Sequence, residues 1–310
     1  MQNADKVEAL FRKLHEESVT FYEDERIRAT QHLERLFAGR TGHPTIAKAL
    51  FPDLKPDRAA LAAEVEREKY ALHQRLKSVE VEFGSRPRTN SKDRFRTSIL
   101  FNNGAHLSVP IFAAGLMADD NSQFENLAGE RGNPWILPHN PSEVNIKVRA
   151  SGLGDYYFFD PWGPTFQTLS TAQVDLWFVF WPDRSALWRL TAIVDLFGFY
   201  YLRANDSWYD SKWTRAKLTA RIGAYQYFWS GVKSFTLLDR DEENVDEGRI
   251  FDDGGWFDTQ TILRVGDPVF FIVRLELTAH PQGYGSYSEI NFSDGSANYI
   301  KPLILLASPV

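Results

Sequence analysis

The sequence changes character near residue 94, and this break constrains the fold more than any other feature. Residues 1–94 contain 34 charged residues, 7 aromatic residues and no tryptophan, whereas residues 95–310 contain 42 charged residues, 37 aromatic residues and all nine tryptophans. Charged, aromatic-poor sequence favours amphipathic helices, whereas aromatic residues favour strands. The break predicts two domains, a helical hairpin with its linker over residues 1–94 and a β domain over residues 95–310.

The first region has the apolar spacing of amphipathic helices. Apolar residues recur at intervals of mostly three and four from Asp5 to Phe37, and again from Asp57 to Phe83. Glycine and proline residues between these two stretches interrupt the pattern. We expect two long helices that pair as an antiparallel hairpin, followed by a polar linker over residues 84–94.

In the second region the apolar period is two, as in strands with one buried face. The alternation is clearest in the segments Trp188 to Leu196, Trp213 to Trp229 and Val269 to Ala279. One polar face per strand indicates antiparallel sheets, because parallel sheets are normally covered on both faces. The predicted fold class is therefore α+β: an N-terminal antiparallel helical hairpin followed by an antiparallel β-sandwich of jelly-roll or Greek-key type.

Composition excludes several classes of protein. The chain has no cysteine, which excludes disulfides and thiolate chemistry. Its net charge of −6 argues against a general electrostatic attraction to nucleic acid or to an anionic membrane surface, which leaves only a local basic patch open. The segment from Met1 to Leu10 lacks the basic and apolar regions of a signal peptide, so we expect synthesis in the cytoplasm, with the final destination open. The apolar stretch from Val174 to Leu202 is interrupted by charges, so no transmembrane segment is expected.

Motifs that would indicate an enzyme are missing. The dipeptide Gly-Lys of phosphate-binding loops does not occur, and no serine has glycines two residues away on both sides. The seven histidines are not spaced to place two imidazoles on one face of a helix. The sequence therefore predicts no catalytic residues and no cofactor other than a possible calcium ion, and a protein that is not an enzyme.

The calcium hypothesis rests on an acidic segment from Asp239 to Asp253, which we expect to form a loop between two strands. Carboxylate oxygens are the ligands that calcium prefers. The spacing is not that of an EF-hand, because Asn244 and Ile250 stand where glycine and glutamate are needed. A solvated acidic loop is the simpler interpretation. The candidate ligands are Asp239, Asp241, Glu243 and Asp246.

A glycan site is a second possibility, because exposed aromatic rings stack on sugars and carboxylates accept hydrogen bonds from hydroxyl groups. The alternative is that these rings close the end of the core. A related hypothesis is a glycoside hydrolase with a carboxylate pair drawn from Asp206, Asp210 and Glu289. The predicted glycan-binding residues are Asp206, Trp208, Tyr209, Asp210 and Trp213.

The polar face of the predicted strand from Trp213 to Trp229 is basic. It carries Arg215, Lys217 and Arg221, flanked by Trp213, Tyr225 and Tyr227. Such a face could bind an acidic partner. Within a region whose net charge is −8, a solvated face paired with neighbouring strands is the simpler interpretation.

The function favoured by the sequence is that of a non-enzymatic interaction or assembly protein. Its helical part would mediate self-association, giving a homo-oligomer, or docking to another protein, and the β-sandwich would form the body or binding head. The remaining alternatives are a glycan-binding module, a glycoside hydrolase and a membrane-active, pore-forming protein whose long strands re-pair. The predicted interaction residues form an apolar stripe of Leu10, Leu14, Phe21, Leu33 and Leu36.

Overall fold

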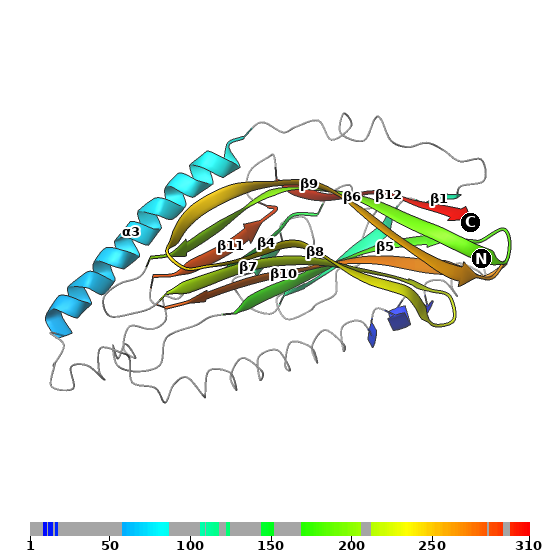
Figure 1. Cartoon of the computed structure of the whole chain (residues 1–310), viewed down its shortest axis with the longest axis horizontal. Coiled ribbons are helices and arrows are strands. Elements are labelled where there is room, and N and C mark those ends of the chain that lie inside the picture. The colour runs from blue at the N-terminus through cyan, green and yellow to red at the C-terminus, as the bar shows by residue number, and fades with distance from the viewer. Residues whose placement is uncertain are drawn as a thin grey trace.

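The computed structural model describes residues 9–10, 12–14, 16–17, 58–86, 106–108, 110–117, 122–124, 144–151, 169–205, 212–283, 285–293 and 298–310. Two antiparallel sheets face each other, and a single long helix lies along one of them (Figure 1). We name the seven-stranded sheet A and the five-stranded sheet B.

Every strand pair in both sheets is antiparallel. In sheet A the order is β1-β12-β6-β11-β4-β3, and β9 pairs with the other edge of β6. The strands of sheet A are β1 (His106–Ser108), β3 (Ser122–Phe124), β4 (Ile146–Ser151), β6 (Ala186–Ala204), β9 (Val245–Leu263), β11 (Tyr287–Asn291) and β12 (Tyr299–Pro309). Those of sheet B, in the order β2-β5-β10-β7-β8, are β2 (Pro110–Met117), β5 (Ser170–Phe180), β7 (Trp213–Tyr225), β8 (Trp229–Glu242) and β10 (Val269–Gln282).

The chain crosses repeatedly between the two sheets. Strands β4 to β7 alternate between sheet A and sheet B, and β8 to β11 cross three more times. The central strands are thereby ordered β4-β11-β6-β9 in one sheet and β5-β10-β7-β8 in the other, which is the order of a jelly roll. These crossings bring strands that are far apart in the sequence to the same face.

The core lies between the sheets, as the two-residue period predicts. Leu218 and Ile222 of β7 and Val273 and Leu275 of β10 are all at most 1% exposed. These residues sit on one face of their strands because successive side chains point to opposite faces. The buried set continues onto sheet A through β6, so one core joins the two sheets.

The strand boundaries differ from those predicted in two places. The alternating run from Trp213 does not continue to Trp229, because the chain turns at residues 226–228 and returns as β8. The acidic segment after Asp239 is not a loop, since it forms the end of β8, a turn at Asn244 and the start of β9. Cross-strand cations explain the second difference, because they compensate the carboxylates that argued for a loop.

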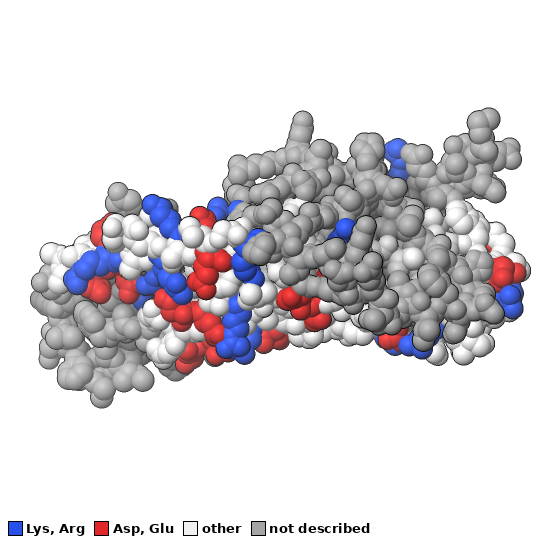
Figure 2. Space-filling view, turned by 90° about the horizontal axis from the view of Figure 1, so that it is seen from above, with Lys and Arg blue, Asp and Glu red and all other residues white. Residues whose placement is uncertain are grey.

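The helix α3 (Arg58–Gly84) packs on the outer face of sheet A. Its Leu72, Val79 and Phe83 are buried, at three- and four-residue spacings along with the half-buried Leu76. The ring of Phe83 stacks on Phe199 of β6, with centroids 5.1 Å apart. Acidic and basic side chains are interspersed on the face seen in Figure 2, and several form pairs within α3.

A buried ion cluster fixes one part of α3 to the strands. Glu68 accepts a hydrogen bond of 3.0 Å from Arg203 Nη2 and lies 3.6 Å from Lys212 Nζ. Both cations are almost fully buried, so the carboxylate of Glu68 compensates charges that water cannot reach. Together with the stacked rings, this cluster makes α3 part of the fold.

The predicted N-terminal helical hairpin is wrong. The residues described between 9 and 17 are helical, but they pack on sheet B, whereas α3 packs on sheet A. Each apolar helical stripe therefore lies against a sheet rather than against the other helix. The hairpin was inferred from two adjacent amphipathic patterns, and such patterns do not specify which apolar surface each will bury. Among the described residues, no helix is long and apolar enough to span a membrane.

Candidate functional site: a pocket on the outer face of sheet B

Three charged residues lie side by side on the outer face of sheet B. The strand register places Arg274 of β10 between Asp175 of β5 and Arg221 of β7. Arg274 donates two hydrogen bonds of 2.8 Å to the buried carboxylate of Asp175, one to each oxygen. Gln173 donates a third, of 2.9 Å, to the same carboxylate. The guanidinium of Arg274 is thus held in one orientation by a buried partner.

Arg221 is more exposed than Arg274 and lies near a second carboxylate. Its Nη2 atom lies 3.8 Å from Oε1 of Glu276, and Thr219 donates a hydrogen bond of 3.2 Å to Oε2 of the same residue. The side chain of Arg221 is 33% exposed, whereas that of Arg274 is 10% exposed. The row therefore contains one fixed guanidinium and one that solvent reaches.

An apolar patch adjoins this charged row. Trp177, Phe270 and Ile272 are buried beneath Leu14 of the N-terminal helical segment, and Leu10, Val179 and Tyr225 pack around them. Tryptophan is well suited to this boundary because its ring is apolar while its indole N–H is polar. The outer face of sheet B is thus apolar at the end near residues 225 and 270 and polar beyond it.

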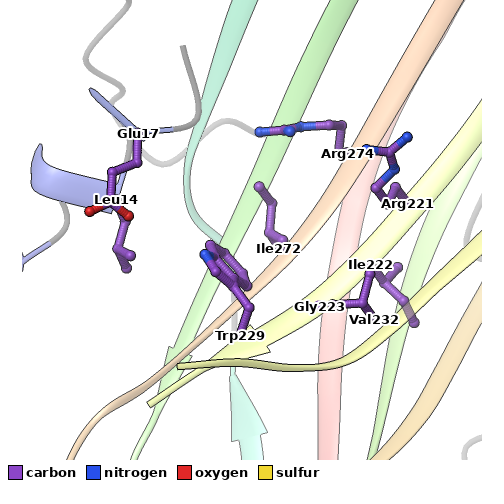
Figure 3. A pocket seen from close by; sticks show the side chains of 9 residues that line it. All are labelled: Leu14, Glu17, Arg221, Ile222, Gly223, Trp229, Val232, Ile272 and Arg274. Atoms are coloured by element: carbon purple, nitrogen blue, oxygen red, sulfur yellow. The ribbon is translucent and has the colours of Figure 1, made fainter. Parts of the chain in front are cut away.

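A pocket of about 360 Å³ lies where these two parts meet (Figure 3). The N-terminal helical segment supplies one wall, and β7, β8 and β10 supply the rest. In the close-up, Trp229 lies on the side facing Leu14, and the two arginines lie at the other end. Its lining consists of Leu14, Glu17, Arg221, Ile222, Gly223, Trp229, Val232, Ile272 and Arg274.

The ring of Trp229 is held in place by its aromatic neighbours. Its centroid lies 6.2 Å from that of Trp177 and 5.5 Å from that of Tyr225, and both pairs are inclined rather than parallel. The side chain is nevertheless 38% exposed, so part of the ring is accessible. A braced ring with an accessible surface can stack on a ligand with little loss of its own conformational freedom.

Gly223 leaves the space that Trp229 occupies. A Cβ atom at this position would lie 3.3 Å from the Trp229 ring and 3.4 Å from a methyl group of Val232. These distances are shorter than an ordinary carbon contact. A larger side chain here would displace the ring, so the absence of a side chain at Gly223 shapes the pocket.

The pocket combines hydrogen-bond donors, an acceptor and an aromatic surface. The guanidinium groups donate only, and the carboxylate of Glu17 accepts only. Glu17 is anchored by Lys13, whose Nζ lies 3.8 Å from its Oε1 atom. Mostly apolar walls with a few convergent polar groups are typical of small-ligand sites, and the volume falls in the usual range of about 300–1,000 Å³.

The predicted glycan site around Trp213 lies elsewhere. Trp213 begins β7, at the end of the strand away from the pocket, and its ring meets His280 edge-on with centroids 4.8 Å apart. Its indole N–H donates a hydrogen bond to Asp241. Asp206, Trp208, Tyr209 and Asp210 lie outside the described residues, so this site stays a prediction.

His280 occupies a buried position at that same end. Burial, followed by the positive charge of Arg215, lowers the pKa of His280 to about 4. The imidazole is therefore neutral at pH 7, where it packs against Trp213.

The four predicted calcium ligands do not share one set of contacts. Arg215 donates two hydrogen bonds of 2.9 Å to Asp239, and Trp213 donates one to Asp241. Glu243 is exposed in the turn between β8 and β9. Within the described ranges, no group of three or more histidine, aspartate or glutamate side chains could hold a metal ion.

The fourth predicted ligand, Asp246, contacts α3 and β6. It accepts hydrogen bonds of 2.9 Å from Arg75 and from the hydroxyl group of Tyr201. Burial, followed by the charge of Asp246, raises the pKa of Tyr201, which therefore stays a donor at neutral pH. Asp246 thus contributes to the attachment of α3.

Two of the predicted interaction residues contact the chain itself. Leu14 is 1% exposed and Leu10 is half-buried, both against sheet B. Phe21, Leu33 and Leu36 lie outside the described residues. Docking through these three residues stays a prediction. Leu14 lines the pocket.

The hydrolase candidate Glu289 lies on β11 in sheet A, away from the pocket. It is buried and accepts hydrogen bonds of 2.8 Å from Tyr287 and 2.6 Å from Asn291. Both candidate partners, Asp206 and Asp210, lie outside the described part of the chain.

Sequence reasoning missed most of the pocket. The alternating pattern predicts Arg221 on a polar face and Trp229 at the end of the same strand. It predicts Ile272 and Arg274 in a different strand. Residues 226–228 are Gln-Tyr-Phe, without glycine or proline, so the sequence carries no clear signal for the turn that returns Trp229 to its position beside β7. The contribution of Leu14 and Glu17 has no local signal, because it depends on where the N-terminal segment packs.

Comparisons with known proteins do not identify a family for this chain. No family model and no curated protein matches the chain. Among solved structures, TmCBM61 in complex with β-1,4-galactotriose is similar over 73% of this chain and 100% of its own, with 6% identity and a TM-score of 0.19.

Two other solved structures are similarly distant. The GH31 α-xylosidase of Xanthomonas citri has 13% identity over 67% of this chain and 20% of its own, with a TM-score of 0.15. The structure of infectious bursal disease virus, Gt strain, has 9% identity over 68% of this chain and 56% of its own, with a TM-score of 0.16. TM-scores this low carry no argument about function.

Proposed function

We propose that the protein is a non-enzymatic binding protein that holds a neutral saccharide in the pocket on the outer face of sheet B. The observation that carries this proposal is the combination of a braced, accessible tryptophan ring with hydrogen-bonding groups in one pocket. A sugar presents apolar C–H groups on its faces and hydroxyl groups around its edge. The ring suits the first, and the charged groups suit the second.

The charges in and around the pocket favour a neutral ligand over an anionic one. Arg274 is paired with Asp175, and Arg221 lies near Glu276, while Glu17 adds a further negative charge. The site therefore has no excess of positive charge among these residues. A guanidinium carries five N–H donors, so one group can hold a carboxylate and a ligand hydroxyl at the same time.

Binding is favoured over hydrolysis by the carboxylates of the pocket. Glycoside hydrolysis in its common form uses two acidic residues on either side of the scissile bond. The described lining residues include one carboxylate, that of Glu17, and its side chain is 53% exposed. Such a group can accept hydrogen bonds from sugar hydroxyls.

The test is calorimetric titration of the full chain with a panel of neutral oligosaccharides, β-1,4-linked glucose, galactose, mannose and xylose oligomers. We expect at least one to bind, and Trp229→Ala to weaken its binding by about 2 kcal/mol, roughly thirtyfold. The matched control is Trp256→Ala, because Trp256 is 42% exposed and does not line the pocket. This control should bind as the unchanged protein does.

Three results would contradict the proposal. The first is the absence of binding to every oligosaccharide in the panel. The second is an equal loss of affinity in Trp229→Ala and Trp256→Ala. The third is release of new reducing ends during incubation, which would show an enzyme.

A further inference from the structure

Three turns meet at one end of the sandwich, the right-hand end in Figure 1. They join β5 to β6 at residues 181–185, β7 to β8 at residues 226–228 and β9 to β10 at residues 264–268. We call this part of the molecule the turn end. The described residues of α3 lie toward the opposite end in the same view.

Hydrogen bonds between the turns hold the turn end in one shape. The side-chain amide of Gln226 donates to the carbonyl oxygens of Arg264 and Asp267, at 2.7 and 3.1 Å, and its oxygen accepts from the Arg264 N–H at 2.9 Å. The N–H of Val265 donates to Ser185 at 3.1 Å, which joins the third turn. The hydroxyl group of Tyr227 donates to Asp267. The turn end is therefore a preorganised surface.

Large apolar side chains are exposed on and beside these turns. Phe228 is 69% exposed, Val265 is 53% exposed and Tyr227 is 51% exposed, although each belongs to a braced turn. Burial of these side chains would be favourable. Their exposure together therefore indicates a surface that contacts another protein or a membrane. The same end also exposes Trp181, Ile262 and Val310.

Three ion pairs in and beside the turn end have the cation as the more exposed member, while the exposed Asp267 accepts the hydrogen bond of Tyr227. The side chain of Arg184 is 59% exposed and that of its partner Asp183 is 43% exposed. Arg189 and Lys233 are 57% and 49% exposed, and both lie 3.9 Å from Asp258, which is 42% exposed. In these pairs the cations are therefore more accessible than the carboxylates, although the whole chain has a net charge of −6.

We propose that the turn end binds the surface of a phospholipid bilayer. Tryptophan and tyrosine prefer the level of the lipid headgroups, phenylalanine and valine reach the acyl chains, and arginine and lysine pair with phosphates. The turn end carries all three kinds of side chain, with exposed aromatic and aliphatic residues on its turns and accessible cations such as Arg184, Arg189 and Lys233 among and beside them. A bilayer also accepts projecting tips without a complementary shape, which a second copy of the chain would have to provide.

This surface is distinct from the saccharide pocket. None of Trp181, Tyr227, Phe228, Ile262, Val265 or Val310 is among the residues that line the pocket. The bilayer proposal therefore does not depend on the proposed function.

The test is co-sedimentation of the full chain with vesicles of phosphatidylcholine mixed with phosphatidylglycerol, in low salt. The double variant Phe228→Ser and Val265→Ser should lower vesicle binding by about tenfold or more. The matched control is Tyr70→Ser with Val81→Ser on α3, because these side chains are 67% and 69% exposed, at the other end of the molecule. The control should bind as the unchanged protein does, and far-ultraviolet circular dichroism should show that both variants fold.

Other outcomes would overturn the proposal. An unchanged chain that stays in solution with these vesicles has no bilayer-binding end. Equal losses in the two double variants would show unspecific adsorption. If the unchanged protein is a dimer without lipid, and the turn-end variant alone is a monomer that binds vesicles as before, the turn end is an interface between two copies.

Discussion

The outer faces of the two sheets differ in the described helical residues that lie on them. On sheet A, the side chains of α3 bury Phe199, Tyr201 and Tyr287 in one apolar cluster, and the ion cluster of Glu68 adds to it. On sheet B, the segment around Leu14 buries the end with Trp177 and leaves a pocket beside it. Among the described residues, the comparison teaches that the apolar parts of both outer faces are buried by apolar helical side chains, whereas the pocket lies where an apolar part meets a charged row.

The physical reason for the difference is the match between helix and strand side chains. Four apolar residues of α3, spaced over three turns, pack against three aromatic rings on β6 and β11. The apolar part of sheet B's outer face ends at the charged row of Asp175, Arg274 and Arg221. In this row Asp175 and Arg274 are buried as a hydrogen-bonded ion pair, so this part of the face offers no apolar surface to a helix.

The largest expected effect tests the covered face. Replacing Phe83 by alanine removes the ring that stacks on Phe199 and fills the space above Gly248, where a Cβ atom would lie 2.6 Å from it. We expect the free energy of unfolding to fall by about 4 kcal/mol, measured by urea denaturation. Val81→Ala, at an exposed position on the same helix, should change it by less than about 0.5 kcal/mol. Similar effects from both would show that α3 is not part of the core.

The second prediction concerns the pH dependence of sheet B at the end away from the pocket. The pKa of His280 is about 4 in the folded protein and about 6.5 in the unfolded chain. As the pH falls below about 6.5, the unfolded chain binds a proton that folded His280 does not, so stability decreases down to about pH 4. The loss from this residue should be about 3 kcal/mol.

The measurement is urea denaturation at several pH values between 7 and 4, for the unchanged protein and for His280→Gln. The variant should show a smaller decrease in stability over this interval, whatever its stability at pH 7. Parallel curves for the two proteins would mean that His280 titrates normally and is not buried as described.

The smallest expected effect on stability separates binding from folding on sheet B. Arg221→Ala should change the free energy of unfolding by at most about 0.5 kcal/mol, because the side chain is partly exposed and its ion pair with Glu276 is long. It should nevertheless weaken saccharide binding by about tenfold. Arg189→Ala, which removes another exposed and loosely paired arginine, is the control for both measurements and should leave binding unchanged. A large loss of stability in Arg221→Ala would show that Arg221 stabilises the fold and would contradict its role as a binding residue only.

The sequence predicted elements where one local pattern was sufficient. Alternation placed Leu218 and Val273 in the core, and helical spacing identified the segment that became α3. It did not identify the hairpin around Asn244, because a run of carboxylates favours a loop unless cations such as Arg215 are known to lie opposite. It placed Trp229 in the wrong strand, since a turn of three polar and aromatic residues does not interrupt an alternating pattern clearly.

By itself, the sequence determined what kind of surface each segment carries, because side-chain chemistry and its period are local properties of the chain. It determined that the second region forms antiparallel strands, although β5, β6 and β10 carry apolar residues on both faces. Only the tertiary structure decided which apolar surfaces meet, since many pairings bury similar area and the choice depends on shape and on where charges interrupt the surface. In the folded chain Phe83 packs on sheet A and Leu14 packs on sheet B, and Trp229 and Arg274 line one pocket.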